Sequence, residues 1–140
     1  MRVVLDTNVF ISGIFWDRNY CSQLIEKWKN KEIELISSFE IVKELVETLR
    51  SFKIPMPENM IEEWKSFIFK NSIFVEPLSK IKIVKDDPDD NKFLEAALDG
   101  KAELIVSQDG HLLDLKEYNG IKIVKPEEAI KIVKLISDKY

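Results

Sequence analysis

Short apolar runs alternate with longer amphipathic stretches throughout this chain, and this alternation limits its fold more than any other feature. The runs with the length and composition of buried strands are Val3–Leu5, Glu34–Ile36, Ile73–Val75, Leu104–Val106 and Ile121–Val124. Helical periodicity between them predicts helices over Cys21–Asn30, Ser38–Ser51, Pro57–Lys70, Pro88–Asp99 and Pro126–Ser137. Such alternation predicts an α/β fold in which helices cover both faces of a central parallel sheet of about five strands.

The length and composition fit one globular unit. A chain of 140 residues has the size of one domain, so we expect a single domain over residues 1–140. No apolar stretch approaches the roughly 20 residues that cross a membrane, and the start MRVVLDTN lacks the regions of a signal peptide. We therefore expect a cytoplasmic protein with no membrane partner. The single cysteine, Cys21, has no second thiol to pair with, which predicts a small buried side chain in a reducing compartment.

Capping and proline patterns support the helix boundaries. Ser37 and Glu40 have the spacing of a capping box. Asp87 precedes Pro88 and would cap a helix whose first residue is that proline. The segment 55–57 holds two prolines between two helical stretches, with no strand between them, which predicts a helical hairpin.

Four acidic residues that are far apart in the sequence fall where such a sheet would bring them to one edge. Asp6 and Asp109 follow the first and fourth predicted strands, and ligands of doubly wound sheets bind at the carboxyl ends of strands. Glu44 lies at the border of the apolar face of its helix, and Asp90 lies on the buried face of its own. Gathered carboxylates repel one another unless a cation lies between them. The sequence therefore predicts a site for a hard divalent cation.

Each acidic residue also has an ordinary structural interpretation. Asp6 could form an Asx-turn, and Asp109 could cap a short helix. Asp90 could lie in the first turn of a helix capped by Asp87, and Glu44 could be a solvated flank. Four such coincidences at one edge of one sheet are a poorer explanation than one shared site.

Polar neighbours accompany the four acids. Thr7, Asn8 and Ser107 offer neutral hydrogen-bonding groups that suit the orientation of metal ligands. Asp89 is a candidate for a supporting role or for a substitute ligand. His111 is the only histidine, and we expect it to be a polar surface side chain and not a catalytic base.

Four segments in this order and spacing, VVLDTNVFISGI, FEIVKELVETL, DDPDDNKFLEAAL and LIVSQDGHLL, resemble the PIN domain family over essentially the whole chain. More narrowly, the chain resembles stand-alone prokaryotic PIN proteins of the VapC type, the toxin components of toxin-antitoxin systems. The resemblance implies a Rossmann-like three-layer α/β/α fold. It also implies a metal-dependent endoribonuclease that acts on RNA, forms a homodimer and is inhibited by an antitoxin protein.

The resemblance assigns the acidic positions of the family to Asp6, Glu44, Asp90 and Asp109, as catalytic residues and metal ligands. Mg²⁺ or Mn²⁺ suits this role, because phosphodiester hydrolysis needs an activated water and neutralisation of the phosphoryl oxygens. One position departs from the family. Many members carry a second aspartate two residues after the last acid, where this chain has His111.

Three alternatives stay open. A phosphoacceptor receiver domain also gathers acids and Mg²⁺ at a sheet edge, but it would carry paired acids after the first strand, where this chain has Thr7 and Asn8. A haloacid-dehalogenase-like phosphatase would need aspartate in place of Asn8. A PIN-like module that binds RNA or protein without cutting is the third. The net charge of −4 argues mildly against tight nonspecific binding of nucleic acid.

Overall fold

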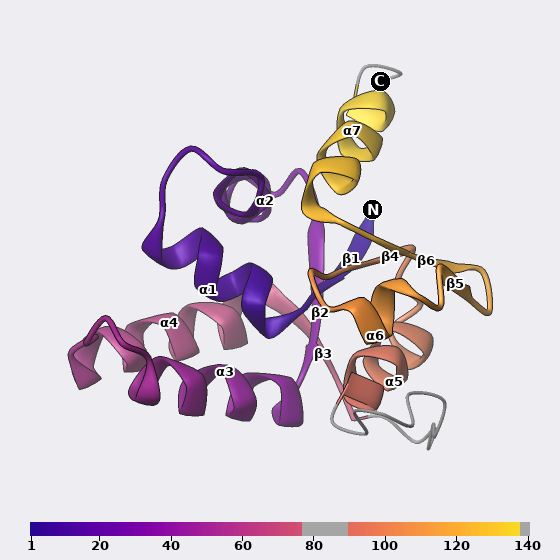
Figure 1. The fold of residues 1–140 in the computed structure, drawn as a ribbon. Coiled ribbons are helices and arrows are strands. Elements are labelled where there is room, and N and C mark those ends of the chain that lie inside the picture. Colours follow the sequence, from indigo (N-terminus) through magenta and orange to yellow (C-terminus); the bar gives the residue numbers. More distant parts are fainter. Residues whose placement is uncertain (77–89, 138–140) are drawn as a thin grey trace.

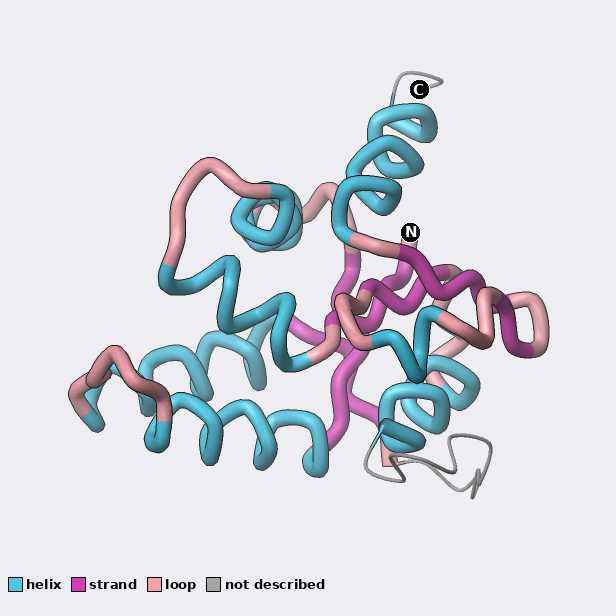
Figure 2. The backbone as a smooth tube through the Cα atoms, in the orientation of Figure 1, coloured by secondary structure: helices cyan, strands magenta, loops and turns pink. Residues whose placement is uncertain are grey.

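A computed structural model describes residues 1–76 and 90–137. In these residues a six-stranded sheet is flanked by helices on both faces (Figures 1 and 2). The elements in chain order are β1 (Arg2–Leu5), α1 (Thr7–Phe15), α2 (Tyr20–Lys29), β2 (Glu34–Ser38), α3 (Phe39–Ser51), α4 (Glu58–Asn71), β3 (Ser72–Val75), α5 (Asn91–Asp99), β4 (Leu104–Val106), α6 (Gly110–Leu113), β5 (Glu117–Tyr118), β6 (Ile121–Val124) and α7 (Pro126–Ser137).

The strands lie in the order β3-β2-β1-β4-β6-β5. Every pairing in this sheet is parallel except that of β5 with β6. These two strands are joined at Asn119 and Gly120, which have φ values of 49° and 83°, as a tight hairpin turn requires. The centre of the sheet is the pair β1 and β4, in which Leu5 lies opposite Val106. The residues that follow these two strands, Asp6 and Ser107, therefore emerge side by side at the carboxyl edge.

The predicted α/β architecture is confirmed, and so are all the predicted strands. The sheet has one strand more than the five predicted. This additional strand, β5, was not predicted because two residues are too few to show an alternating pattern. Helix α1 was also not predicted. Its sequence, TNVFISGIF, contains β-branched and aromatic residues and a glycine, which have low helix propensity. Burial of Val9, Phe10 and Ile11 against the sheet and the neighbouring helices outweighs that propensity.

Two helix starts differ from the prediction. Helix α3 is capped by Ser38, whose Oγ accepts a hydrogen bond from the N–H of Ile41 at 3.3 Å, so the predicted capping box at Ser37 is wrong. Helix α5 begins at Asn91. The predicted start at Pro88 and its cap at Asp87 lie outside the described residues. The predicted hairpin does form, from α3 and α4, which lie along one another in Figure 1.

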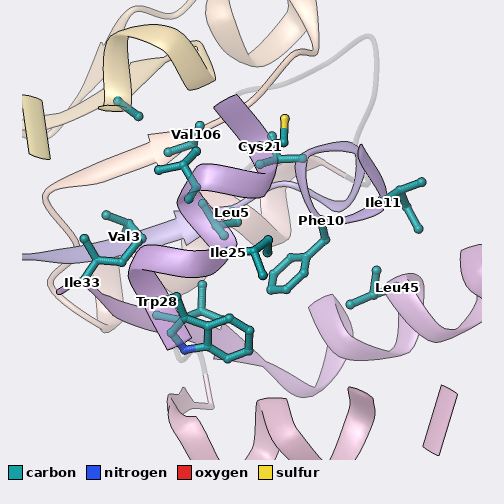
Figure 3. Close-up of a cluster of buried hydrophobic side chains, with 14 of the residues drawn as sticks. Val3, Leu5, Phe10, Ile11, Cys21, Ile25, Trp28, Ile33, Leu45 and Val106 are labelled. Atoms are coloured by element: carbon teal, nitrogen blue, oxygen red, sulfur yellow. The ribbon is translucent and has the colours of Figure 1, made fainter. Parts of the chain in front are cut away.

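Two apolar clusters, one on each face, hold the layers together. Because side chains alternate along a strand, Val3 and Leu5 face the layer of α1, α2, α3, α4 and α7, whereas Val4 faces α5 and α6. Figure 3 shows the larger cluster, in which Phe10 and Trp28 meet edge to face with ring centroids 5.8 Å apart. Cys21 belongs to this cluster and is 2% exposed, as predicted. No helix in the part of the chain that the structure describes is long and apolar enough to span a membrane.

Candidate metal centre

Asp6 follows β1 and occupies the N-cap position of α1, but its side chain makes no capping hydrogen bond to that helix. Its carboxylate is buried and accepts a hydrogen bond from Ser107 Oγ at 2.7 Å. Burial raises the pKa of the Asp6 carboxyl above its usual range. The hydrogen bonds from Ser107 and from the N–H of Thr7 oppose this rise, and the carboxylates of Glu44 and Asp109 add to it. Asp6 is therefore a buried acid that a nearby cation would stabilise.

Ser107 connects Asp6 to Asp109. Its hydroxyl is fully buried after β4, donates to Asp6 and accepts from the backbone N–H of Asp109 at 2.9 Å. A hydroxyl has one proton to donate and lone pairs to accept with, so this residue can fix both acids at once. The predicted supporting position of Ser107 beside the acids agrees with this geometry.

Asp109 caps α6. Its Oδ1 accepts a hydrogen bond from the backbone N–H of His111 at 2.7 Å, so the structural interpretation of this residue is confirmed. The same carboxylate lies close enough to Asp6 for its negative charge to help raise the pKa of that acid. Capping and participation in a site are compatible, since one oxygen receives the N–H and the carboxylate retains further lone pairs.

Asp90 is buried, with 6% of its surface exposed, and occupies the N-cap position of α5 without a capping hydrogen bond to that helix. It therefore faces inward, as predicted. Ligand atoms of Asp90, Asp109 and His111 all lie within 4.8 Å of one another. Among the residues described, this is a group with the composition and spacing to hold a metal ion. The grouping includes His111, which we expected to be an unrelated surface side chain.

Glu44 lies beside Asp6 but is held by other residues. Thr7 Oγ1 donates to its Oε2, and Lys92 Nζ lies 2.8 Å from its Oε1. The Glu44 side chain is 32% exposed, which places it at the border of the α3 core face, as predicted. Lys92 comes from the first turn of α5 and brings a positive charge into the acidic cluster. The sequence does not indicate this pairing, because a lysine in the first turn of a helix is usually solvated.

The remaining predicted neighbours contribute less. Asn8 is exposed in the first turn of α1. Asp89 lies outside the described residues. The described side chains thus form two parts. One is the group of Asp90, Asp109 and His111, which runs from the buried Asp90 to the exposed His111, and the other is the buried acid Asp6 with Glu44 at its side.

The donor set fits a divalent cation. Two carboxylates and an imidazole offer oxygen and nitrogen atoms within one coordination sphere of each other. The buried carboxylate of Asp6 requires a nearby positive charge to ionise at low cost, and Lys92 is already paired with Glu44. A cation between the two parts would take its ligands from the group of Asp90, Asp109 and His111. It would also supply the positive charge that the Asp6 carboxylate requires.

Sequence comparisons show which family the chain resembles. A sequence model of the family described as PIN domain matches residues 2–111. A curated protein, uncharacterized protein MJ1680 of Methanocaldococcus jannaschii, is 27% identical over 147 aligned residues, which cover 94% of this chain and 90% of that protein.

Three solved structures share the fold. VapBC2 from Rickettsia felis, bound to a DNA fragment from its promoter, has a TM-score of 0.59 at 13% identity and covers 88% of this chain and 97% of the solved chain. FitAcB from Neisseria gonorrhoeae has a TM-score of 0.57 at 16% identity, with coverages of 89% and 98%. FitAB bound to the IR36 DNA fragment has a TM-score of 0.56 at 13% identity, with coverages of 89% and 94%.

Proposed function

The chain belongs to the PIN domain family, and from this premise we propose that it is a metal-dependent endoribonuclease that hydrolyses RNA phosphodiester bonds. The observation that carries the proposal is the group of Asp90, Asp109 and His111, with ligand atoms within 4.8 Å, beside the buried acid Asp6. PIN domains are typically nucleases, and this group gives the present chain the ligands that such chemistry needs.

Asp6, Asp90 and Asp109 are proposed to hold one or two ions of Mg²⁺ or Mn²⁺. A bound ion would neutralise the phosphoryl oxygens and make a water molecule nucleophilic at neutral pH. Ser107 holds the carboxylate of Asp6 and the backbone of Asp109, and the N–H of His111 binds the Asp109 carboxylate, so rotation of both ligands is restricted. Because the residues are fixed before substrate binds, little reorganisation is needed during the reaction.

Glu44 is proposed to orient the attacking water or to reach a second ion. Thr7 and Lys92 hold its two oxygens, so the side chain stays at the border of the site. Lys92 is a fixed positive charge beside the acids, where it would also attract a phosphate of the RNA backbone.

The similar structures suggest the biological setting. VapBC and FitAB are toxin-antitoxin complexes, and this chain matches one subunit fold of each complex over most of its length. We propose that the present chain is the toxin of such a pair, that an antitoxin protein inhibits it, and that it forms a homodimer. Co-expression with the product of a small adjacent gene, followed by size-exclusion chromatography, tests the partner.

Cleavage of single-stranded RNA by the purified protein tests the activity. Mg²⁺ or Mn²⁺ should support cutting, and EDTA should abolish it. Asp6→Asn and Asp109→Asn should each lower the rate by about a hundredfold or more, because each removes a proposed ligand of the ion that activates the water. The control is Asp114→Asn, which makes the same change at the exposed C-cap of α6 and should leave the rate unchanged.

Two results would contradict the proposal. Cutting by Asp6→Asn in EDTA would exclude the metal site as the source of activity. RNA binding without cleavage, in the presence of either metal, would favour a non-cleaving PIN-like module.

A further inference from the structure

The geometry points to His111 as a nitrogen ligand that makes the metal site of this chain prefer Mn²⁺ and similar transition ions to Mg²⁺. This inference rests on the proposed function, because it concerns the ion of the same site. It goes further because it assigns the preference of the site between Mn²⁺ and Mg²⁺ to one residue, His111.

Short local contacts hold His111 at the site. Its backbone N–H donates to Asp109 Oδ1 at 2.7 Å, which ties the residue to the carboxylate two positions earlier. Its ring Nδ1 lies 3.7 Å from the same oxygen, beyond the usual range of an N–H···O hydrogen bond. The ring is therefore near the acids without being fixed to one of them. A ligand atom of the ring lies within 4.8 Å of Asp90 as well as of Asp109.

The exposure of the ring lets it turn toward an ion. The His111 side chain is 49% exposed, whereas the Asp109 side chain is 24% exposed and Asp90 is buried. Rotation of the imidazole about its side-chain bonds would open no cavity in the core. Two carboxylates fixed by the fold and one adjustable imidazole can thus close around an ion from the solvent side.

The chemistry of the imidazole gives the selectivity. Mg²⁺ demands hard oxygen ligands and keeps several of its waters. Imidazole nitrogen suits transition ions, whose affinity for nitrogen-containing sites rises from Mn²⁺ through Fe²⁺ and Co²⁺ to Ni²⁺. A neutral imidazole in the place of a carboxylate adds no negative charge, so Mg²⁺ gains little electrostatic attraction in return for the oxygen ligand that it lacks. With His111 in place, the transition ion gains a ligand that Mg²⁺ uses poorly.

Electron paramagnetic resonance of Mn²⁺ bound to the untagged protein tests the inference without measuring activity. His111 is the only histidine of the chain, so imidazole ¹⁴N coupling in the electron spin echo of bound Mn²⁺ can come from no other residue. We expect this coupling in the wild type and its loss in His111→Ala and His111→Asp. Thermal melts without metal check that both variants fold.

Competition between the two ions supplies the second measurement. The wild type should need a much higher ratio of Mg²⁺ to Mn²⁺ for displacement than His111→Asp, by about tenfold or more, the scale on which changes near a metal shift its affinity. His111→Ala should bind Mn²⁺ about tenfold more weakly than the wild type.

The outcomes separate this inference from the proposed function. Mn²⁺ binding that shows no ¹⁴N coupling in the wild type, or the same displacement ratio in His111→Asp, would overturn the role of His111 and leave the metal site intact. Failure of the wild type to bind Mn²⁺ or Mg²⁺ at millimolar concentration would overturn both.

Discussion

Lys92 Nζ lies 2.8 Å from Glu44 Oε1, and this ion pair joins α5 to α3 across the acidic cluster. The Lys92 side chain is 12% exposed, so its charge is more shielded from water than that of a surface lysine. Since Thr7 donates to the other oxygen of Glu44, each carboxylate oxygen of this acid has a partner before any ion arrives. Lys92 therefore compensates the charge of one acid of the cluster, and the carboxylate keeps lone pairs for a water molecule or an ion.

The first prediction removes this lysine. Lys92→Met should lower the free energy of unfolding of the metal-free protein by about 1 kcal/mol, because it leaves Glu44 without its cation at a partly solvated position. The same variant should gain more stability from saturating Mn²⁺ than the wild type does, because the cluster then has one more uncompensated negative charge. Urea denaturation with and without Mn²⁺ measures both changes.

Lys43→Met is the matched control for Lys92→Met. Lys43 is exposed on α3, one residue from Glu44 in sequence, and should tolerate the change with little effect in either condition. An equal response of the two variants to Mn²⁺ would show that Lys92 does not compensate the acidic cluster.

Much of the fold follows from sequence because it depends on local patterns. The runs around Val4 and Ile105 are short and rich in Val, Leu and Ile, which favours buried strands, and their alternation with amphipathic helices predicts a parallel sheet. Helix α1 could not be predicted in the same way. Its residues favour strand conformations locally, and only the sheet and the helices packed around it make the helix the better arrangement.

In the site, too, the features that depend on local sequence patterns could be predicted, and those that depend on packing between elements could not. Asp6 and Asp109 were predictable because the carboxyl end of a parallel strand is a defined place in the fold. The inward direction of Asp90 followed from helical periodicity. The ion pair of Lys92 with Glu44 and the proximity of His111 to Asp90 could not be predicted, because they depend on how two elements approach each other in space. The periodicity of apolar residues shows which face of a helix or strand is buried, but it does not show which element packs against that face.

The second prediction concerns the hydrogen bond from Ser107 to Asp6. Ser107→Ala should destabilise the protein by about 1–3 kcal/mol, because it removes the side-chain donor of a buried carboxylate. In an Asp6→Asn background the cost should be smaller by about 1 kcal/mol, since a hydrogen bond to a neutral amide is weaker than one to a carboxylate. A double-mutant cycle measured by urea unfolding gives this coupling. The buried Ser37 of β2 supplies the control, since Ser37→Ala should cost the same in both backgrounds.

The third prediction is a pH dependence. Burial, Glu44 and Asp109 raise the pKa of Asp6 in the folded state above the ordinary value of 3.8 that it keeps when unfolded. The folded protein therefore binds more protons at this group than the unfolded chain, and the free energy of unfolding falls as the pH rises through that interval. Asp6→Asn removes this pH-dependent fall in the free energy of unfolding, because an amide does not titrate. In EDTA, the stability of the variant relative to the wild type should be lowest below about pH 4, increase with pH, and level off above the folded pKa.

Urea unfolding from pH 3.5 to 7.5 measures that difference. Saturating Mn²⁺ should make the variant less stable relative to the wild type near neutral pH than it is in EDTA, because the ion stabilises the ionised carboxylate of the wild type and loses a ligand in the variant. A stability difference that does not change with pH would exclude a raised pKa for Asp6.

The last prediction tests how α1, the helix that begins beside Asp6, is held in place. A Cβ added at Gly13 would lie 2.7 Å from Ile25 Cγ1 and 2.8 Å from the carbonyl oxygen of Cys21 in α2. The carbonyl belongs to a helix backbone and cannot move aside, so the gain of about 1 kcal/mol in helix propensity should not compensate the clash. Gly13→Ala should lower the free energy of unfolding by about 1–3 kcal/mol. Gly110→Ala is the control, because a Cβ there meets nothing within 4 Å and should be neutral or slightly stabilising. If urea denaturation found the two alanine variants equally stable, α1 and α2 would not be in the close contact that positions the start of α1 at the site.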